Sequence, residues 1–375
     1  MARVVPEPKY PGGTLTLAEQ IAPPTHKPLE WRVVVEPLEV GTDAFISDVI
    51  LPHVEAGLSC TVLGPPGTGK TECLKKIAAT LEAQGHRVAK ISLAHVAARI
   101  IEGSTVHSFL ARMVLNGTFK GVVLLDEISN EVLPLLAALD IARLGGARII
   151  CFGDFDQLPP ISNSCRGNAV PDDVFQRSRL YKTWANSTMF KLTRARRCDP
   201  EHFKFYTTLP TRLEDAIKAA ALRHPPNADA DWNLVISNHR RRTISTRRQV
   251  LEARGHEVTL VPKGDDPEYP LFVGTRLIGC LTVRDAVNGA FYVVRAIAPV
   301  CVIEDELTKQ TWEATPEELA KCTQLRHAMT YSKAQGQTLV GTVALWDLNS
   351  VHFTRRHLYV GTSRVKQGEL LFVNV

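Results

Sequence analysis

The sequence lacks long apolar runs: no stretch of its 375 residues approaches the roughly 20 apolar residues that a membrane-spanning helix needs. Its first residues, MARVVPEPKYPGGT, have no apolar core and do not form the pattern of a secretory signal. No CxxC pair occurs among the eight cysteines, which argues against a zinc site or a disulfide framework and favours a reducing compartment. We therefore expect a soluble intracellular protein of the cytoplasm, the nucleus or a viral factory, without membrane contact and without zinc.

A strong excess of one charge is also lacking. The formal net charge of +5 permits an anionic partner but does not demonstrate one. With 45% hydrophobic and 22% charged residues, the composition is that of an ordinary globular protein. The length is sufficient for two domains and a small insert.

Three kinds of pattern divide the chain. Residues 1–40 are rich in proline and are expected to form an N-terminal extension. Residues 41–188 alternate short apolar runs with helical patterns, and 189–375 begin a second alternation of this kind. Such patterns predict α/β domains with parallel sheets covered on both faces. At about 262–325 the runs become short and alternating, and VNGA at 287–290 predicts a hairpin turn with positive φ angles, so we expect a small β insert.

A phosphate-binding loop is the clearest motif. GPPGTGKT, Gly64 to Thr71, matches GxxxxGK[ST] and lies between an apolar run and a helical pattern. Backbone N–H groups of such a loop hold phosphate oxygens, and the helix dipole adds to the attraction. Lys70 is expected to reach the β- and γ-phosphates, and the Thr71 hydroxyl to bind Mg²⁺.

An acidic pair ends the next apolar run. VVLLDE places Asp126 and Glu127 at the end of a buried strand, where an unpaired carboxylate costs several kcal/mol. Beside a phosphate loop the partner of Asp126 is expected to be Mg²⁺. Glu127 is then positioned to take a proton from the attacking water.

The stretch IICFGDFDQLPPI, residues 149–161, delivers an amide to the same edge. Because ligands lie at the carboxyl ends of parallel strands, Gln157 is expected within reach of the γ-phosphate or of the water that attacks it. A neutral amide can bond to both groups. The alternative is a proline bend that leaves Gln157 in solvent.

Together these segments resemble superfamily-1 helicases of the PIF-type and RecD-type branch. The evidence is the order of seven matches from Gly64 to Val373, because beyond the phosphate loop no single match is strong. In chain order they are GPPGTGKT (motif I), STVHSF (104–109), LLDEIS (motif II), GDFDQLPP (motif III), LTRARR (192–197, motif IV), YSKAQGQTL (331–339, motif V) and LYVGTSRVKQGELLFV (358–373, motif VI).

The resemblance implies two RecA-like domains with ATP and Mg²⁺ in the cleft between them. The first, 41–188, would have a very short subdomain 1B, and the second, 189–375, would carry an SH3-like insert. The resemblance assigns catalytic roles to Lys70, Glu127, Gln157, Arg197 and Arg364, the two arginines reaching across the cleft. The implied ATP contacts are Gly64, Pro65, Pro66, Gly67, Thr68, Gly69, Lys70, Thr71 and Gly336, and the implied metal ligands are Thr71 and Asp126.

The same resemblance implies 5′→3′ movement on a single strand, with DNA favoured over RNA, and leaves room for replication or recombination partners. Hydroxyls for phosphates and rings for bases are typical of single-strand binding. The candidate contacts are Ser104, Thr105, His107, Ser108, Phe109, Lys333, Gln335 and Thr338. For the first segment the alternative is a buried helix start with Phe109 in the core. The five arginines of SNHRRRTISTRRQ (237–249) form either a solvated helix face or a path for the backbone.

Two departures from the family pattern restrict what the resemblance implies. The family usually has an adenine-reading Gln some 20–25 residues before the phosphate loop, and VGTDAFISDVILPHVEAG contains none, so the resemblance does not imply a strict preference for ATP. Only about a dozen residues separate Phe109 from Val122, which leaves little room for the family's wedge hairpin.

Three other functions remain open from the sequence alone. An RNA helicase of the positive-strand-virus type shares the two-domain arrangement, although LPP after Gln157 and the HSF segment favour the DNA branch. A P-loop kinase of a small substrate accounts for motifs I and II but leaves 190–375 unexplained. A non-catalytic relic is disfavoured by the intact set of candidate catalytic residues.

Overall fold

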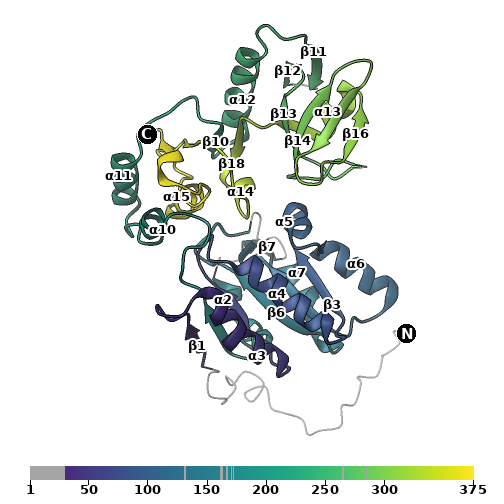
Figure 1. The fold of residues 1–375 in the computed structure, drawn as a ribbon, viewed down its shortest axis with the longest axis vertical. Coiled ribbons are helices and arrows are strands. Elements are labelled where there is room, and N and C mark those ends of the chain that lie inside the picture. The colour runs from purple at the N-terminus through teal and green to yellow at the C-terminus, as the bar shows by residue number, and fades with distance from the viewer. Residues whose placement is uncertain are drawn as a thin grey trace, which may run out of the picture. The chain divides into compact units, whose positions relative to one another are not determined.

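The computed structural model describes residues 30–375 except 131, 161–163, 166–167, 170, 172, 264–265 and 284. The first part of the chain, from β1 to β9 (residues 32–191), contains a seven-stranded sheet in which neighbouring strands are parallel (Figure 1). In spatial order the strands are β1 (Arg32–Val35), β9 (Thr188–Lys191), β2 (Thr61–Leu63), β6 (Arg148–Gly153), β5 (Val122–Asp126), β3 (Val88–Ser92) and β4 (Ser104–Thr105).

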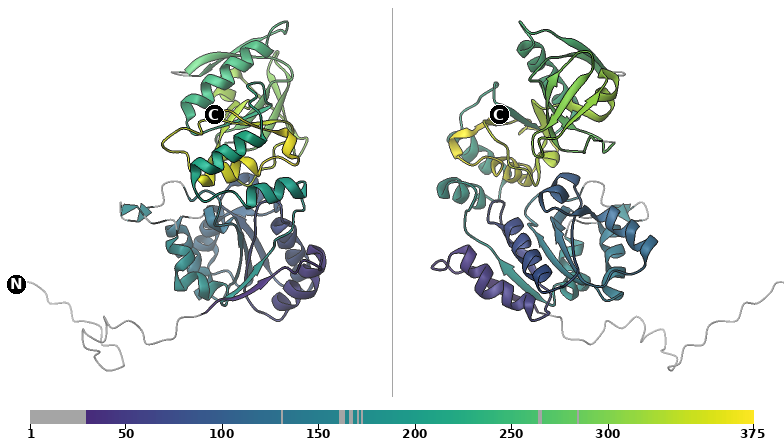
Figure 2. Two further views of the ribbon diagram at one scale, coloured as in Figure 1. Left: turned by 90° about the vertical axis from the view of Figure 1, so that its left-hand side faces the viewer. Right: turned by 45° about the vertical axis from the view of Figure 1, so that its right-hand side comes forward.

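Continuous apolar sequence explains the inner strands, since every residue of β5 is buried and helices cover both faces of the sheet (Figure 2). The helix after the phosphate loop, α4 (Lys70–Ala83), buries Leu74, Ile77, Ala78 and Leu81, the spacing of one helical face. The other elements of this part are α2 (Thr42–Phe45), η1 (Ile46–Ile50), α3 (Leu51–Glu55), α5 (His95–Ile100), α6 (Val106–Asn116), η2 (Ile128–Asn130), α7 (Leu133–Leu144), α8 (Val174–Arg177), α9 (Arg179–Trp184) and the β7–β8 pair (Ser164–Cys165, Asn168–Ala169).

Two predicted boundaries are corrected by this sheet. The segment 1–40, predicted as an extension, contains β1, which pairs with β9 at the sheet edge. Residues 189–191, predicted to open the second domain, lie in β9 between β1 and β2. Phe190 is buried in the same core as α4. An apolar run predicts a strand but does not say which sheet it joins, which is why both limits were misplaced.

The second part contains a four-stranded parallel sheet in the order β18 (Ala328–Thr330), β10 (Trp232–Val235), β19 (Val343–Leu345) and β20 (Leu371–Val373). Its helices are α10 (Pro200–Thr207), α11 (Leu213–Arg223), α12 (Asn238–Glu252), α14 (Tyr331–Ala334), α15 (Arg355–Thr362) and η3 (Gly368–Leu370). Among the residues that the structure describes, no helix combines the length and apolarity needed to cross a membrane.

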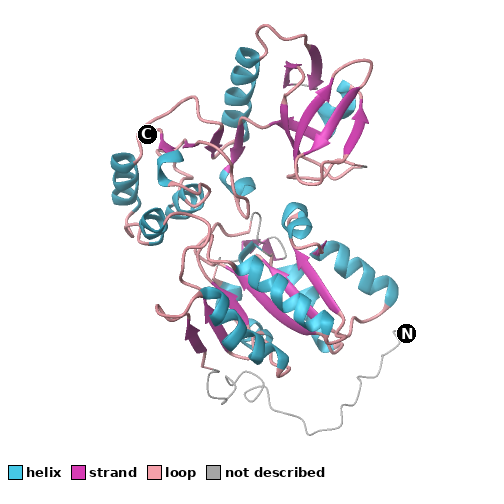
Figure 3. Cartoon of the chain, viewed as in Figure 1, coloured by secondary structure: helices cyan, strands magenta, loops and turns pink. Residues whose placement is uncertain are grey.

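An antiparallel region occupies the place of the predicted β insert (Figure 3). It consists of the pair β11 (Thr259–Lys263) and β12 (Asp266–Leu271), a five-stranded sheet and the helix α13 (Pro316–Cys322). The sheet order is β16 (Thr311–Ala314), β15 (Cys301–Asp305), β14 (Phe291–Ala296), β13 (Arg276–Gly279) and β17 (Thr323–Leu325). Its likeness to an SH3 module stays a prediction.

The predicted turn at 287–290 is present before β14, with the Ala290 N–H donating to the Val287 carbonyl at 3.0 Å. Only Gly289, with a φ of 84°, has a positive angle, so the turn uses one left-handed residue where the prediction had more than one.

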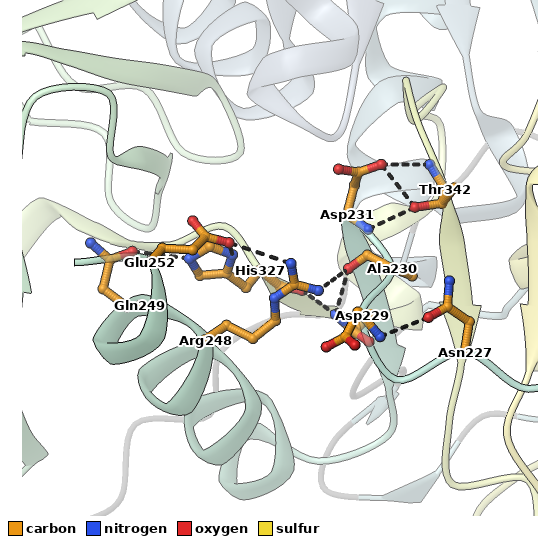
Figure 4. A network of polar contacts seen from close by, with 10 residues as sticks. Asn227, Asp229, Ala230, Asp231, Arg248, Gln249, Glu252, His327 and Thr342 are labelled. Carbon is orange, nitrogen blue, oxygen red and sulfur yellow. Dashed lines mark hydrogen bonds and ion pairs between the residues drawn. The ribbon is translucent and has the colours of Figure 1, made fainter. Parts of the chain in front are cut away.

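Polar contacts join α12 to this antiparallel region, and Figure 4 shows the part of the network around Arg248, Gln249 and His327. Gln249 donates to the Pro270 carbonyl at 2.7 Å and to the Thr275 hydroxyl at 2.9 Å, and its Oε1 lies 2.9 Å from His327 Nε2. Because His327 lies between β17 and β18, this network fixes the point where the chain returns to the second parallel sheet. Arg248, one of the five arginines of residues 237–249, also makes an internal contact, because it donates to the Ala230 carbonyl at 2.6 Å.

The network makes stability dependent on pH. Burial lowers the pKa of His327 to about 4, with Arg248, Arg326 and Arg276 adding to the fall and Glu252 opposing it. The unfolded chain takes up a proton near pH 6.5, so this contribution is complete above that pH and is lost as the pH falls toward 4.

We expect roughly 1–2 kcal/mol of stability to be lost between about pH 7.5 and about pH 5 through this group. His327→Gln should therefore lose less of its thermal unfolding midpoint over this range than the wild type. His239→Gln, at an exposed position near the start of α12, is the control and should follow the wild type. Equal losses in wild type and His327→Gln would contradict the assignment.

Candidate functional site

The loop 64–69 connects the buried strand β2 to the N-terminus of α4. Gly69, which precedes the helix, has a φ of 97°, a conformation that glycine adopts without strain. At Gly64 a Cβ atom would lie 2.6 Å from the Leu192 carbonyl oxygen, so only glycine fits there. Lys70 Nζ donates to the Gly64 and Pro65 carbonyls at 2.6 and 3.1 Å. The loop thus holds a positive charge beside a helix N-terminus, an arrangement that binds anions.

Two carboxylates lie at the end of β5. Asp126 is buried, and its Oδ1 accepts from the Glu127 N–H at 3.0 Å. Burial raises the pKa of Asp126 to about 7, Glu127 adds to the rise, and Lys70 opposes it. Glu127 has a φ of 56°, which is strained for a non-glycine residue, and its buried Oε2 has no partner among the described residues. Strain of this kind gathers at functional sites.

Gln157 is not in solvent, because its side chain is 3% exposed. Its Nε2 lies 3.5 Å from Asp154 Oδ2, and its buried Oε1 has no hydrogen-bond partner in the described part of the chain. Pro159 and Pro160 lead the chain from this amide to the wall of a second hollow. The proline bend is therefore present, but it keeps Gln157 inside the molecule.

Arg197 is contributed by the segment between β9 and α10. Its Nη1 donates to the Thr338 hydroxyl at 2.9 Å and its Nη2 to the Ser363 carbonyl at 2.7 Å. Its buried Nε has no partner among the residues that are described. Burial lowers the pKa of Arg197, which an arginine tolerates while remaining charged. A Cβ at Gly67 would lie 3.1 Å from the Cβ of Arg197, so this arginine packs on the phosphate loop.

Arg364 differs from Arg197 in how its bonds are used. Its Nε donates to the Val360 carbonyl at 2.9 Å, and its Nη1 donates to the Gln337 and Ala334 carbonyls at 2.8 and 3.2 Å. It is 1% exposed, and burial lowers its pKa, as does the charge of Arg197. This guanidinium therefore ties α15 to the segment after α14 as well as bordering the cavity.

These residues surround a cavity of about 640 Å³, which we call the P-loop cavity. Of the predicted site residues, those that line it are Pro66, Gly67, Gly69, Lys70, Thr71, Glu127, Gln157, Arg197, Gly336, Thr338 and Arg364. Gly336, with a φ of 74°, brings the second part of the chain close: a Cβ there would lie 3.7 Å from Glu127 Oε1.

A second hollow of about 360 Å³ lies beyond Gly336, and we call it the Lys333 hollow. Its walls include Lys333, Gln335 and Gln337 from the second part and Pro159 and Pro160 from the first. The turn at Asn288–Gly289 and the start of α5 complete it, and a Cβ at Gly289 would lie 2.9 Å from Val96.

Two predicted nucleic-acid contacts need correction. Phe109 is 4% exposed and packs on Phe119 with ring centroids 5.4 Å apart, so it belongs to the core and offers no face for a base. Thr338 lines the P-loop cavity and bonds Arg197, and it is not among the residues that line the Lys333 hollow.

The other candidate residues of STVHSF (104–109) lie on both sides of the start of α6 and have different surroundings. The Thr105 hydroxyl accepts from the Ser108 N–H at 3.2 Å and so caps the helix. His107 and Ser108 are exposed on the first turn, outside the residues that line either cavity. Ser104 accepts from Arg112 at 2.6 Å. The short connection 117–121 from α6 to β5 matches the predicted lack of room for a wedge hairpin.

Sequence reasoning missed several residues at the P-loop cavity. Arg196 and Lys366 line it, and the Tyr206 hydroxyl donates to the Pro66 carbonyl at 2.7 Å. Asp154, 5% exposed, accepts from the Tyr359 hydroxyl at 2.8 Å. Asp154 and Tyr359 lie inside the motifs GDFDQLPP and LYVGTSR, but a motif does not say which two of its side chains meet.

Comparison with known proteins adds sequence relatives for the first part. A family model described as an AAA domain matches residues 53–173. The ATP-dependent DNA helicase PIF1 of Homo sapiens is 32% identical over 186 residues, which is 41% of this chain and 28% of the human protein. The chain thus spans less than a third of that relative.

Solved structures share the fold over most of the chain. The Pif1 helicase from Candida albicans matches with a TM-score of 0.64 and 19% identity, covering 89% of this chain and 94% of that one. The Pif1 helicase from Bacteroides in complex with ADP-AlF3 and ssDNA matches with a TM-score of 0.61 and 18% identity, covering 88% and 91%. The predicted α/β class with two parallel sheets is confirmed.

Proposed function

We propose that this chain, which has the fold and the ordered motifs of the PIF-type helicases of superfamily 1, is a motor that moves along single-stranded DNA by hydrolysing ATP or a related triphosphate. The observation that carries the proposal is that one glycine, Gly336, lines both the P-loop cavity and the Lys333 hollow. A segment that touches both sites can transmit the state of the nucleotide to a bound strand. The branch implies 5′→3′ movement.

The walls of the P-loop cavity supply the chemistry. Lys70 and the loop N–H groups would hold the phosphates, and Glu127 would accept the proton of the attacking water. The buried carboxylate of Asp126, which precedes Glu127 of the cavity wall, and the hydroxyl of Thr71 in that wall are a donor set that fits Mg²⁺, which prefers oxygen ligands and would supply charge neutralisation on the phosphates. Arg197, from the segment that connects β9 to α10, would stabilise charge on the transferring phosphoryl group.

The Lys333 hollow supports a polynucleotide partner. Its walls contain Lys333, whose Nζ donates to the Gly279 carbonyl at 2.9 Å, and two amides beside proline and valine, a mixture of polar and apolar groups suited to phosphates and sugars. DNA is favoured over RNA because the human relative is named as a DNA helicase and the Bacteroides protein was solved with ssDNA.

The test is the steady-state hydrolysis rate with single-stranded DNA, with single-stranded RNA and with neither. Stimulation by DNA supports the proposal, and stimulation by RNA alone favours the viral RNA helicase alternative. Hydrolysis indifferent to both polymers would remove the motor and leave a P-loop enzyme with another acceptor. Release of a protein block from the 3′ or the 5′ end of an oligonucleotide then gives the direction, and it does so without requiring duplex separation.

Lys333→Ala should weaken single-stranded DNA binding about three- to tenfold and reduce the slope of log affinity against log salt by about 0.7, as expected for one lost phosphate contact. Turnover at saturating DNA should change little. Lys321→Ala, on the helix α13 of the insert, is the control. An unchanged salt slope in Lys333→Ala would show that this ammonium makes no phosphate contact.

A further inference from the structure

One carboxylate oxygen is shared between the two parts of the chain. Asp154 follows β6 and is buried. Its Oδ1 accepts from the Asp156 N–H at 3.0 Å, while its Oδ2 accepts from the Tyr359 hydroxyl at 2.8 Å and lies 3.5 Å from Gln157 Nε2. A tyrosine of α15 and an amide in the P-loop cavity therefore meet at the same atom.

This contact decides which end of Gln157 is free. An amide has a donor end and an acceptor end, and a carboxylate accepts only. With Nε2 directed to Asp154, the acceptor Oε1 remains, buried and without a partner among the described residues, on a side chain that lines the cavity. A carbonyl oxygen can hold a water molecule by one of its hydrogens while Glu127 takes the other. The reversed amide would present two donors and could not do so.

The tyrosine is itself fixed relative to the phosphate loop. Tyr359 lies with its ring edge toward Tyr206, with centroids 5.9 Å apart and planes at 71°. Tyr206 donates to the Pro66 carbonyl of the loop at 2.7 Å. Burial raises the pKa of Tyr359 well above its usual range, so the hydroxyl remains a donor. The bonds from Tyr206 to Pro66 and from Tyr359 to Asp154 join the second part of the chain to the first and would break if the two separated.

We propose that Asp154 is a positioning residue that orients Gln157 for the attacking water, and that the Tyr359 hydroxyl holds Asp154 in this role only while the cleft is closed. The inference rests on the proposed function, since it concerns the same hydrolysis. It makes the second part contribute to water positioning without touching the nucleotide, in addition to the contact from Arg197.

The experiment measures DNA-stimulated hydrolysis by the full chain for Tyr359→Phe and Asp154→Asn. Removing the hydroxyl should lower kcat about tenfold, the order expected for one lost hydrogen bond to a charged group, with KM for the nucleotide within about twofold. Asp154→Asn should lower kcat by about a hundredfold, because the new amide cannot accept from both Tyr359 and Gln157 on one oxygen and also from Asp156 on the other.

Tyr331→Phe is the matched control. Tyr331 is buried in the same core as Tyr359, and its hydroxyl donates to the Trp346 carbonyl at 2.9 Å, so its removal costs a similar buried bond without touching Asp154. Thermal midpoints of the two Phe variants should be lowered alike, while kcat should fall only in Tyr359→Phe.

Wild-type kcat in Tyr359→Phe, or a loss confined to KM, would overturn the inference and leave the proposed function standing. An equal loss of kcat in Tyr331→Phe would do the same, since it would reduce the effect to general destabilisation. A wild-type chain that hydrolyses no nucleotide with or without DNA would instead overturn the proposed function, and this inference with it.

Discussion

Glu127→Gln is expected to lower DNA-stimulated turnover by about 10²–10⁴-fold, the range that a positioned general base contributes, with nucleotide affinity nearly unchanged. The structural reasons are specific to this side chain. Glu127 is held at a φ of 56° directly after β5, and its buried Oε2 has no partner among the described residues. A carboxylate without a partner is free to accept a proton, and an amide of the same shape is not.

Glu72→Gln is the control for this prediction. Glu72 also lines the P-loop cavity, but its side chain is 62% exposed on the first turn of α4. It should retain turnover close to that of the wild type, because solvent screens it from the phosphates. Turnover in Glu127→Gln above about half of the wild-type rate would rule out Glu127 as the base, whatever the control does.

Arg197→Ala should cost about 10³-fold or more in kcat, the magnitude associated with an arginine that stabilises a transferring phosphoryl group. Its two Nη atoms are anchored to Thr338 and Ser363, and its buried Nε is an atom without a partner in the described structure. Arg197→Lys should lose most of this effect as well, since an ammonium cannot keep both anchors and also offer a third donor in the same plane.

Arg194→Ala provides the comparison within the same LTRARR segment. Arg194 is exposed and donates to the Val40 carbonyl at 2.7 Å, away from the residues that line the cavity. Its removal should change kcat by less than about twofold. If Arg194→Ala and Arg197→Ala reduced turnover equally, the effect would belong to the folding of the segment and the proposed role of Arg197 would be wrong.

Arg364 should respond in a different way. Arg364 donates to the backbone carbonyls of Val360, Gln337 and Ala334, all in its own part of the chain. Removing it takes a donor from each of them, although the Val360 carbonyl keeps the Ser363 hydroxyl and the Ala334 carbonyl keeps the Gln337 N–H. The sequence placed both arginines in one catalytic role. The structure distinguishes an arginine with a donor to spare from one whose bonds already join α14 to α15.

A structural feature could be predicted from the sequence when the residues that determine it are close together in the chain. The phosphate loop and the strand ends at Asp126 and Gly153 can be predicted from short patterns, because a turn of glycines and a run of apolar residues constrain the chain wherever they occur. Gln157 was left between the cavity and solvent, and its burial is settled by Asp154 and by the two prolines after Leu158.

The wrong predictions concern residues whose positions depend on contacts with other segments of the chain. Phe109 lies in a segment rich in hydroxyls, which is typical of a surface. Its ring nevertheless packs in the core against Phe119, ten residues further along the chain. Thr338 lies only five residues from Lys333, yet Thr338 lines the P-loop cavity and Lys333 lines the other hollow, a division that their spacing does not predict. The membership of β9 in the first sheet depends on β1 and β2, which no local pattern can reveal.

The hydroxyl hydrogen bonds of Tyr206 and Tyr359, which join the two parts of the chain, also determine how often the two parts separate spontaneously. A buried hydrogen bond contributes a net of about 0.5–1.5 kcal/mol between neutral groups and about 1.5–3 kcal/mol when one group is charged. The bond from Tyr206 to the Pro66 carbonyl and the bond from Tyr359 to the Asp154 carboxylate therefore together favour the closed form by about 2–4.5 kcal/mol. Taken alone, that preference leaves roughly 0.05–3% of molecules open at equilibrium. A donor–acceptor dye pair on α4 and α15 would report the open fraction directly.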